Sequence, residues 1–238
     1  MLLAMSFIIH DSVILCTNLN ELLGETTMRY ELDRLGSDSF EHLIQSLLKG
    51  IAGNSLSVFG DGPDGQREAT IEGAEVPIND AVITHGYTII QAKFKSPDTK
   101  KDDWTWLQNN LKRELDRFRT KASINHDAVP ETWLFFTNIV LTPVFENGIH
   151  DQAERLIAAY KDIIPEIHIF GADDIRAMLE NNRDVAQCYA GFIMPGDVLL
   201  KLQKKLENEE KVVNNSGHIY NQQAETVINV ESVENLYI

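Results

Sequence analysis

The sequence predicts an α/β fold in which a central mixed β-sheet is flanked by helices on both faces. Two observations lead to this prediction. Short stretches rich in β-branched and aromatic residues alternate along the chain with longer stretches whose apolar residues recur every three or four positions. The chain has 238 residues, of which 43% are hydrophobic, and this is enough material for one buried core.

The first elements are a helix and three strands. Residues 37–51 predict an amphipathic helix that begins with a Ser37-Asp38-Ser39 cap, and its apolar positions are Phe40, Leu43, Ile44, Leu47, Leu48 and Ile51. Residues 55–59 and 67–72 predict two strands joined by a turn rich in Gly, Asp and Pro. Residues 87–95 predict a third strand.

The second half of the chain alternates helices with strands. Residues 102–121 predict a long helix, and residues 131–138 a strand buried on both faces because its hydrophobic run is unbroken. A helix is expected over 148–162, a strand over 167–170 and a helix over 173–179. A charged helix over 197–210 and an extended tail to residue 238 are expected to follow.

These elements predict three regions: an N-terminal extension over 1–29, the α/β domain over 30–200, and a charged helix with a linker or assembly tail over 201–238. The apolar opening has no basic residues and is interrupted at His10 and Asp11, which argues against a signal peptide or an anchor. The globular pattern begins only near Arg29, so two alternatives stay open: translation starts at Met28, or the leader is a short extra element. The tail is too short for its own core, so it is expected to pack on this domain, on a partner chain or on the next domain of a longer polypeptide.

The charge is strongly acidic overall but locally basic. A net charge of −15 excludes a surface that binds nucleic acid everywhere. Residues 91–121 nevertheless carry nine Lys or Arg against five Asp or Glu. This island provides candidate DNA contacts, namely Lys95, Lys100, Lys101, Lys112 and Arg113. The alternative is an ordinary solvated helix face.

Several other classes find no support in the motifs. Cys16 and Cys188 form no CxxC pair, so neither a disulfide framework nor a zinc site is encoded, and a reducing, cytoplasmic setting is expected. The histidines show no HxH or HExxH spacing, and GxxxxGK[ST] and GxSxG are absent from the sequence. No membrane partner is expected.

The most informative motifs are the turn that carries Asp64 and the strand that carries Gln91-Ala92-Lys93. Alternation along the strand places Gln91 and Lys93 on one face and Ala92 on the other. A carboxylate, a second oxygen ligand and an ammonium group that converge from adjacent strands suit metal-dependent cleavage of a phosphodiester.

The turn also has two simpler interpretations. Gly60-x-Gly62-x-x-Gly65 matches a dinucleotide-binding pattern, but the residues after Gly65 alternate like a strand, whereas that pattern requires a helix. Asp64-Gly65 is in addition a common turn dipeptide.

In this order of elements, the chain resembles the PD-(D/E)XK nuclease superfamily, in particular its Mrr-like restriction endonuclease branch. The resemblance rests on Phe40-Glu41-x-Leu43 in a helix, Gly-x-Asp64-Gly65 before a strand, Gln91-x-Lys93 and Thr137-Asn138. Residues 61–69 and 189–199 are also similar to the N-terminal effector domains of bacterial NACHT or STAND antiphage defence proteins. The similarity covers roughly residues 30–200 and implies a restriction-endonuclease-like sheet.

The resemblance implies roles for individual residues. Asp64, Gln91 and the Ala92 carbonyl would hold Mg²⁺, with Mn²⁺ as a substitute, and Lys93 would orient water and stabilise charge at the phosphate. Glu41 matches a position where this branch often has an acid. Glu68 would supply the negative charge that Gln91 lacks.

The sequence therefore predicts a Mg²⁺-dependent deoxyribonuclease that cuts double-stranded DNA with low sequence specificity. The resemblance places it in antiphage defence, as a homo-oligomer connected to a STAND or NACHT sensor in cis or in trans. Two alternatives remain open: a non-catalytic module of the same fold that binds nucleic acid or a partner, and a ribonuclease.

Overall fold

The computed structural model describes residues 30–58, 68–73, 75–124 and 129–196, together with residues 198, 200 and 204. All named helices and strands lie in one unit, Leu23–Pro195. Asp64, the N-terminal extension and nearly all of the predicted C-terminal helix and tail lie outside the described residues. The predictions made for them stay predictions.

The centre of the fold is a mixed sheet of five strands in the order β1-β2-β3-β4-β5. The strands are β1 (Leu56–Val58), β2 (Ala69–Ile71), β3 (Thr88–Lys93), β4 (Thr132–Thr137) and β5 (Glu166–Phe170). The pairs β1–β2 and β2–β3 are antiparallel, whereas β3–β4 and β4–β5 are parallel. The prediction of a mixed sheet flanked by helices is therefore confirmed.

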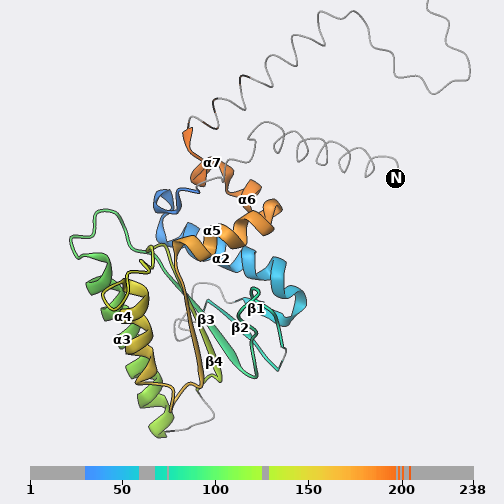
Figure 1. Ribbon diagram of the computed structural model, residues 1–238. Coiled ribbons are helices and arrows are strands. Elements are labelled where there is room, and N and C mark those ends of the chain that lie inside the picture. The colour runs from blue at the N-terminus through green and yellow to red at the C-terminus, as the bar shows by residue number, and fades with distance from the viewer. Residues whose placement is uncertain are drawn as a thin grey trace, which may run out of the picture. The chain divides into compact units, whose positions relative to one another are not determined.

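Helices cover both faces of the sheet (Figure 1). The parallel pairs require crossover connections, which are α3 (Asp103–Ile124) and α4 (Ile149–Ala158). The other face carries α2 (Ser37–Ala52) and α5 (Ala172–Asn181), and the short helices α6 (Arg183–Cys188) and α7 (Ala190–Ile193) follow. Two 3₁₀ turns, η1 (Leu32–Arg34) and η2 (Gly53–Ser55), flank α2. Within the described ranges, no helix is long and apolar enough to cross a membrane.

The hydrophobic core has two layers, one on each face of the sheet. Ile90 and Phe136 belong to the layer beneath α2 and α5, whereas Ile89 and Trp133 belong to the layer beneath α3 and α4. This alternation follows from the period of two along a strand. It assigns Gln91, which lies between Ile90 and Ala92, to the face that α3 covers.

The structure corrects several predicted boundaries. The predicted Ser37-Asp38-Ser39 cap is wrong, because α2 begins at Ser37 and is preceded by Gly36, with no side-chain hydrogen bond at the cap. Strand β3 ends at Lys93 rather than at residue 95, since the backbone of Lys95 bonds to the side chain of Asn138. Helices α6 and α7 were not predicted, because six and four residues are too few to show a helical repeat.

Candidate functional site

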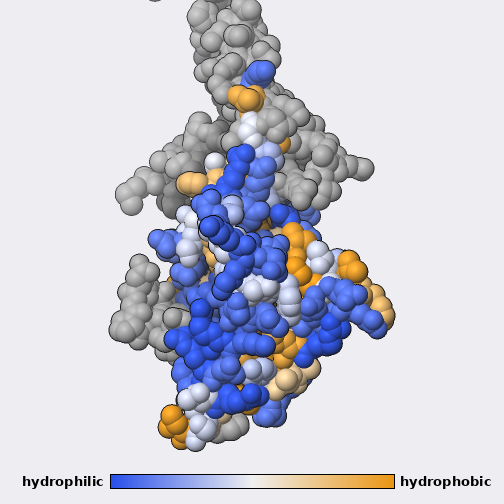
Figure 2. All heavy atoms as spheres, turned by 90° about the vertical axis from the view of Figure 1, so that its left-hand side faces the viewer, coloured by the Kyte–Doolittle hydropathy of each residue, from blue (hydrophilic) through white to orange (hydrophobic). Residues whose placement is uncertain are grey.

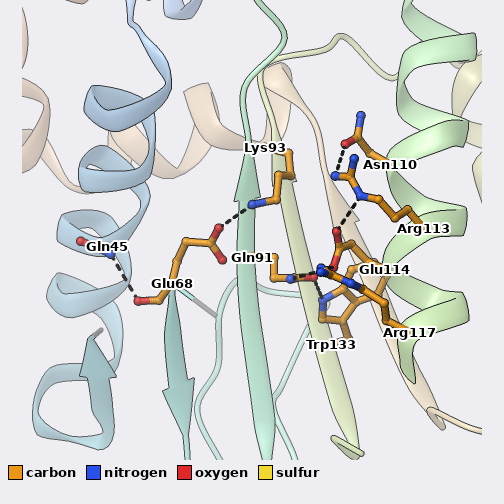
Figure 3. Close-up of polar contacts among 9 residues, drawn as sticks. All are labelled: Gln45, Glu68, Gln91, Lys93, Asn110, Arg113, Glu114, Arg117 and Trp133. Atoms are coloured by element: carbon orange, nitrogen blue, oxygen red, sulfur yellow. Dashed lines mark hydrogen bonds and ion pairs between the residues drawn. The ribbon is translucent and has the colours of Figure 1, made fainter. Parts of the chain in front are cut away.

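Glu68 and Lys93 meet at one edge of the sheet. Glu68 directly precedes β2 and Lys93 ends β3, and the antiparallel register brings these two strand ends together. The Lys93 Nζ donates to Glu68 Oε1 at 2.9 Å (Figure 3). Gln45 of α2 donates from Nε2 to the Glu68 carbonyl oxygen at 3.2 Å, which attaches this edge to the helix.

Glu68 is buried, with only 7% of its surface exposed. Burial raises the pKa of its carboxyl from 4.5 to about 7; the Lys93 ammonium opposes this shift, and the charge of Glu41 on α2 adds to it. The second carboxylate oxygen, Oε2, is buried and has no hydrogen-bond partner among the described residues. A buried oxygen in this condition is costly unless a water, an ion or a residue outside the described ranges bonds to it.

Gln91 lies on the neighbouring strand with its amide facing α3. Its Oε1 accepts a hydrogen bond from Trp133 Nε1 at 2.9 Å, and its Nε2 donates to Glu114 Oε2 at 3.4 Å. The amide oxygen has a second lone pair that could bind a metal ion, but Gln91 is only 1% exposed, so the ion would have to enter this buried network. The Ala92 side chain is fully buried in the layer beneath α2 and α5. The predicted metal roles of Gln91 and of the Ala92 carbonyl stay predictions.

Glu114 is a buried member of the site that the sequence analysis did not select. It is 2% exposed, and Arg113 Nε donates to its Oε1 at 3.1 Å, while Arg117 Nη1 donates to its Oε2 at 3.0 Å. In the sequence, Glu114 is one of the five acids in the basic island of residues 91–121. A signal was present, because position 114 falls on the stripe formed by Leu107, Leu111 and Phe118 of α3, all of which are buried.

Asn138 joins the ends of β3 and β4. Its Oδ1 accepts from the Lys95 backbone N–H at 2.7 Å, and its Nδ2 donates to the Lys95 carbonyl at 3.0 Å and to Asp33 Oδ1 at 2.8 Å. Asn138 therefore holds the segment that follows Lys93. The Lys95 ammonium pairs with Asp103 at 3.0 Å.

The predicted DNA-contacting residues are not equivalent in the structure. Lys100, Lys101 and Lys112 are exposed. Lys95 is largely buried against Asp103, and Arg113 is half exposed with its guanidinium on Glu114. Their predicted role in DNA binding stays a prediction.

The described residues offer only part of a metal site. Among them, no group of three or more His, Cys, Asp or Glu side chains is placed to hold a metal ion. The residue that fits a hard cation best is Glu68, because its unpartnered oxygen is a carboxylate. No protein-family model, curated protein or solved structure matched this chain.

Proposed function

We propose that this chain is a metal-dependent DNA endonuclease with a restriction-endonuclease-like fold of the PD-(D/E)XK type. The observation that carries the proposal is the Glu68–Lys93 pair, in which a buried carboxylate has one oxygen on an ammonium and the other without a partner among the described residues. A phosphodiester nuclease needs this combination of a hard oxygen ligand and a fixed positive charge.

The order of elements supports the proposed fold. The sequence resemblance implies a helix, a first strand, a second strand that is preceded by an acidic residue in its turn, and a third strand that carries Gln-x-Lys. Elements α2, β1, β2 and β3 follow this order, and α3 then crosses to β4, which is parallel to β3.

In the proposed mechanism, Glu68 would hold Mg²⁺, with Asp64 and Glu41 as further acids. When bound, Mg²⁺ would neutralise charge on the scissile phosphate and lower the pKa of a coordinated water. The Lys93 ammonium orients the attacking water and donates to a phosphate oxygen as negative charge develops there. Glu68 keeps Lys93 in this position through the 2.9 Å contact.

The environment of Glu68 also implies a dependence on pH. Because its pKa is raised to about 7, the carboxyl is partly protonated at neutral pH, and a cation must displace this proton to bind. Metal binding, and the cleavage that depends on it, should therefore strengthen as the pH rises from 6 to 8.

A rival function is favoured by one observation. The Gln91 amide is bonded to Trp133 and Glu114, and this is how a structural glutamine would be held. A non-catalytic module that binds DNA or a partner on the same fold would keep this arrangement. The biological setting of either function, as an oligomeric effector in antiphage defence, rests on the sequence resemblance alone.

The test is cleavage of supercoiled plasmid and linear duplex with Mg²⁺ or Mn²⁺, over a range of protein concentrations. We expect Lys93→Ala, Asp64→Ala and Glu68→Gln each to lower the cleavage rate at least about 100-fold. Lys161→Ala and Asp80→Ala are matched controls because both residues are exposed, and they should cleave like the wild type. Cleavage that survives in Lys93→Ala, or no metal-dependent cleavage by the wild type at any concentration, would contradict the proposal and favour the binding module.

A further inference from the structure

Three cations follow one line along α3. Arg113, Arg117 and Lys121 are spaced four residues apart, so they lie on one face of the helix. Successive members are about 6 Å apart along the helix axis, which is close to the distance between neighbouring phosphates of one nucleic-acid strand. We call these three residues the α3 stripe.

The buried carboxylate of Glu114 fixes two members of the stripe. The Arg113 and Arg117 side chains are 56% and 48% exposed, yet the guanidinium of each donates to one oxygen of Glu114. Glu114 is itself bonded to Gln91 of β3, so both guanidiniums are held against the sheet. Side chains that are already ordered lose less entropy when they bind a ligand.

A cleft of about 570 Å³ lies beside the stripe. Gln91 of β3 and the three cations line it, together with Phe118. Two carboxylates also line it, so the lining has three positive and two negative side chains. Glu114 is bonded to the arginines, and Asp116, which is 61% exposed, accepts a hydrogen bond from Tyr160 at 2.8 Å and pairs with Arg119 at 4.0 Å. Hydrophilic side chains predominate on the side of the molecule that α3 and α4 cover (Figure 2), whereas the surface of the cleft itself is more apolar than polar.

We propose that the α3 stripe and its cleft bind the phosphate backbone of the DNA that the site cuts. Gln91 lines the cleft and is two residues from Lys93 on the same strand, so a strand bound along α3 leads toward the Glu68–Lys93 pair (Figure 3). This inference rests on the proposed function and deepens it. Of the predicted DNA contacts it keeps Arg113, and it adds Arg117 and Lys121 of the same helix. Because the net charge of the chain is −15, a polyanion can bind only where cations are concentrated locally, as they are in the α3 stripe.

The test is the affinity for a fluorescent duplex of mixed sequence, measured by anisotropy in EDTA with the Lys93→Ala protein, over a series of salt concentrations. We expect Arg113→Gln with Lys121→Gln to weaken binding about tenfold and to make the slope of log K against log salt shallower by about 2. The matched control is Lys49→Gln with Lys161→Gln, which removes the same charge from two exposed lysines elsewhere and should change the affinity less than about twofold. The single variant Lys121→Gln is also measured. Arg113 and Arg117 are the members of the stripe that bond to Glu114, so this variant tests the stripe without disturbing the buried network.

Each result has a defined meaning. Equal losses in the stripe and control variants, or an unchanged salt slope, would overturn the inference, and cleavage by the wild-type protein in parallel would show that the proposed function survives. Binding that depends on the stripe, without cleavage by the wild type, would support the inference and contradict the nuclease. Tighter binding of a single-stranded RNA of equal length, with the same dependence on the stripe, would overturn the assignment of the ligand as DNA.

Discussion

Glu114 and Glu68 flank strand β3 on opposite sides, and both are buried carboxylates that contact basic side chains (Figure 3). They differ in how their oxygens are bonded. Both oxygens of Glu114 accept hydrogen bonds: Oε1 accepts from Arg113, and Oε2 accepts from Arg117 and Gln91. Only one oxygen of Glu68 does so, from Lys93, and its other oxygen has no partner among the described residues.

The difference separates a structural role from a functional one. A buried polar network in which the carboxylate is bonded at both oxygens rigidifies the fold, so Glu114 fastens α3 to the sheet. A carboxylate with one oxygen unpartnered is costly to keep in the fold and is available to a ligand. Removing Glu114 should therefore reduce stability, whereas replacing Glu68 by its neutral amide should abolish the proposed cleavage and leave the fold intact.

The largest expected effect on stability is that of Glu114→Ala. It deprives the buried Gln91 amide and two guanidiniums of their acceptor, and it leaves a cavity beneath α3. We expect the free energy of unfolding to fall by about 3 kcal/mol, less than for a wholly buried ion pair because both arginines are half exposed. Urea denaturation measures it, and the exposed Glu72→Ala is the control. A loss below about 1 kcal/mol would mean that Glu114 does not fasten α3.

The next largest effect is the change in the free energy of unfolding with pH that the Glu68 carboxyl causes. Its pKa is 4.5 ordinarily and about 7 in the folded protein, so between these values the folded state binds more protons than the unfolded state. The stability that this provides is complete below pH 4.5 and is lost as the pH rises through 7. Between pH 5 and pH 8 in EDTA, the wild type should lose about 2 kcal/mol more than Glu68→Gln does. Parallel pH profiles for the two proteins would show that burial does not perturb this carboxyl.

These two glutamates also show how far sequence reasoning reaches in this chain. The helices and strands of the sheet were predictable because their apolar residues follow the local periods of 3.6 and two. The hydrogen-bond partners were not predictable, because the bond from Trp133 to Gln91 spans 42 residues and that from Asn138 to Lys95 spans 43. Alternation predicts that Gln91 and Lys93 share a face, but the element that covers each of them depends on the tertiary fold.

Trp133→Phe tests the link between Gln91 and the sheet. The substitution removes the indole N–H that donates to Gln91 Oε1 and leaves this buried oxygen without that donor. We expect a loss of about 1.5 kcal/mol in the free energy of unfolding. Trp106→Phe, at a partly buried position of α3, should cost less. An equal cost at the two positions would show that the hydrogen bond to Gln91 adds nothing to the packing of the ring.

The smallest expected effect on stability is that of Lys95→Gln. This substitution extends the comparison of buried carboxylates to Asp103, a carboxylate near the surface that pairs with Lys95. Lys95 pairs with Asp103, whose side chain is 50% exposed, so solvent screens the pair and its loss should cost about 0.5 kcal/mol or less. Because Asp103 already partners the ammonium, Lys95→Gln should also weaken duplex binding less than Lys121→Gln does. Thermal unfolding and anisotropy measured on the same preparations check both expectations. A larger loss of affinity for Lys95→Gln would place the DNA backbone at the ends of β3 and β4, where Asn138 holds Lys95, instead of along α3.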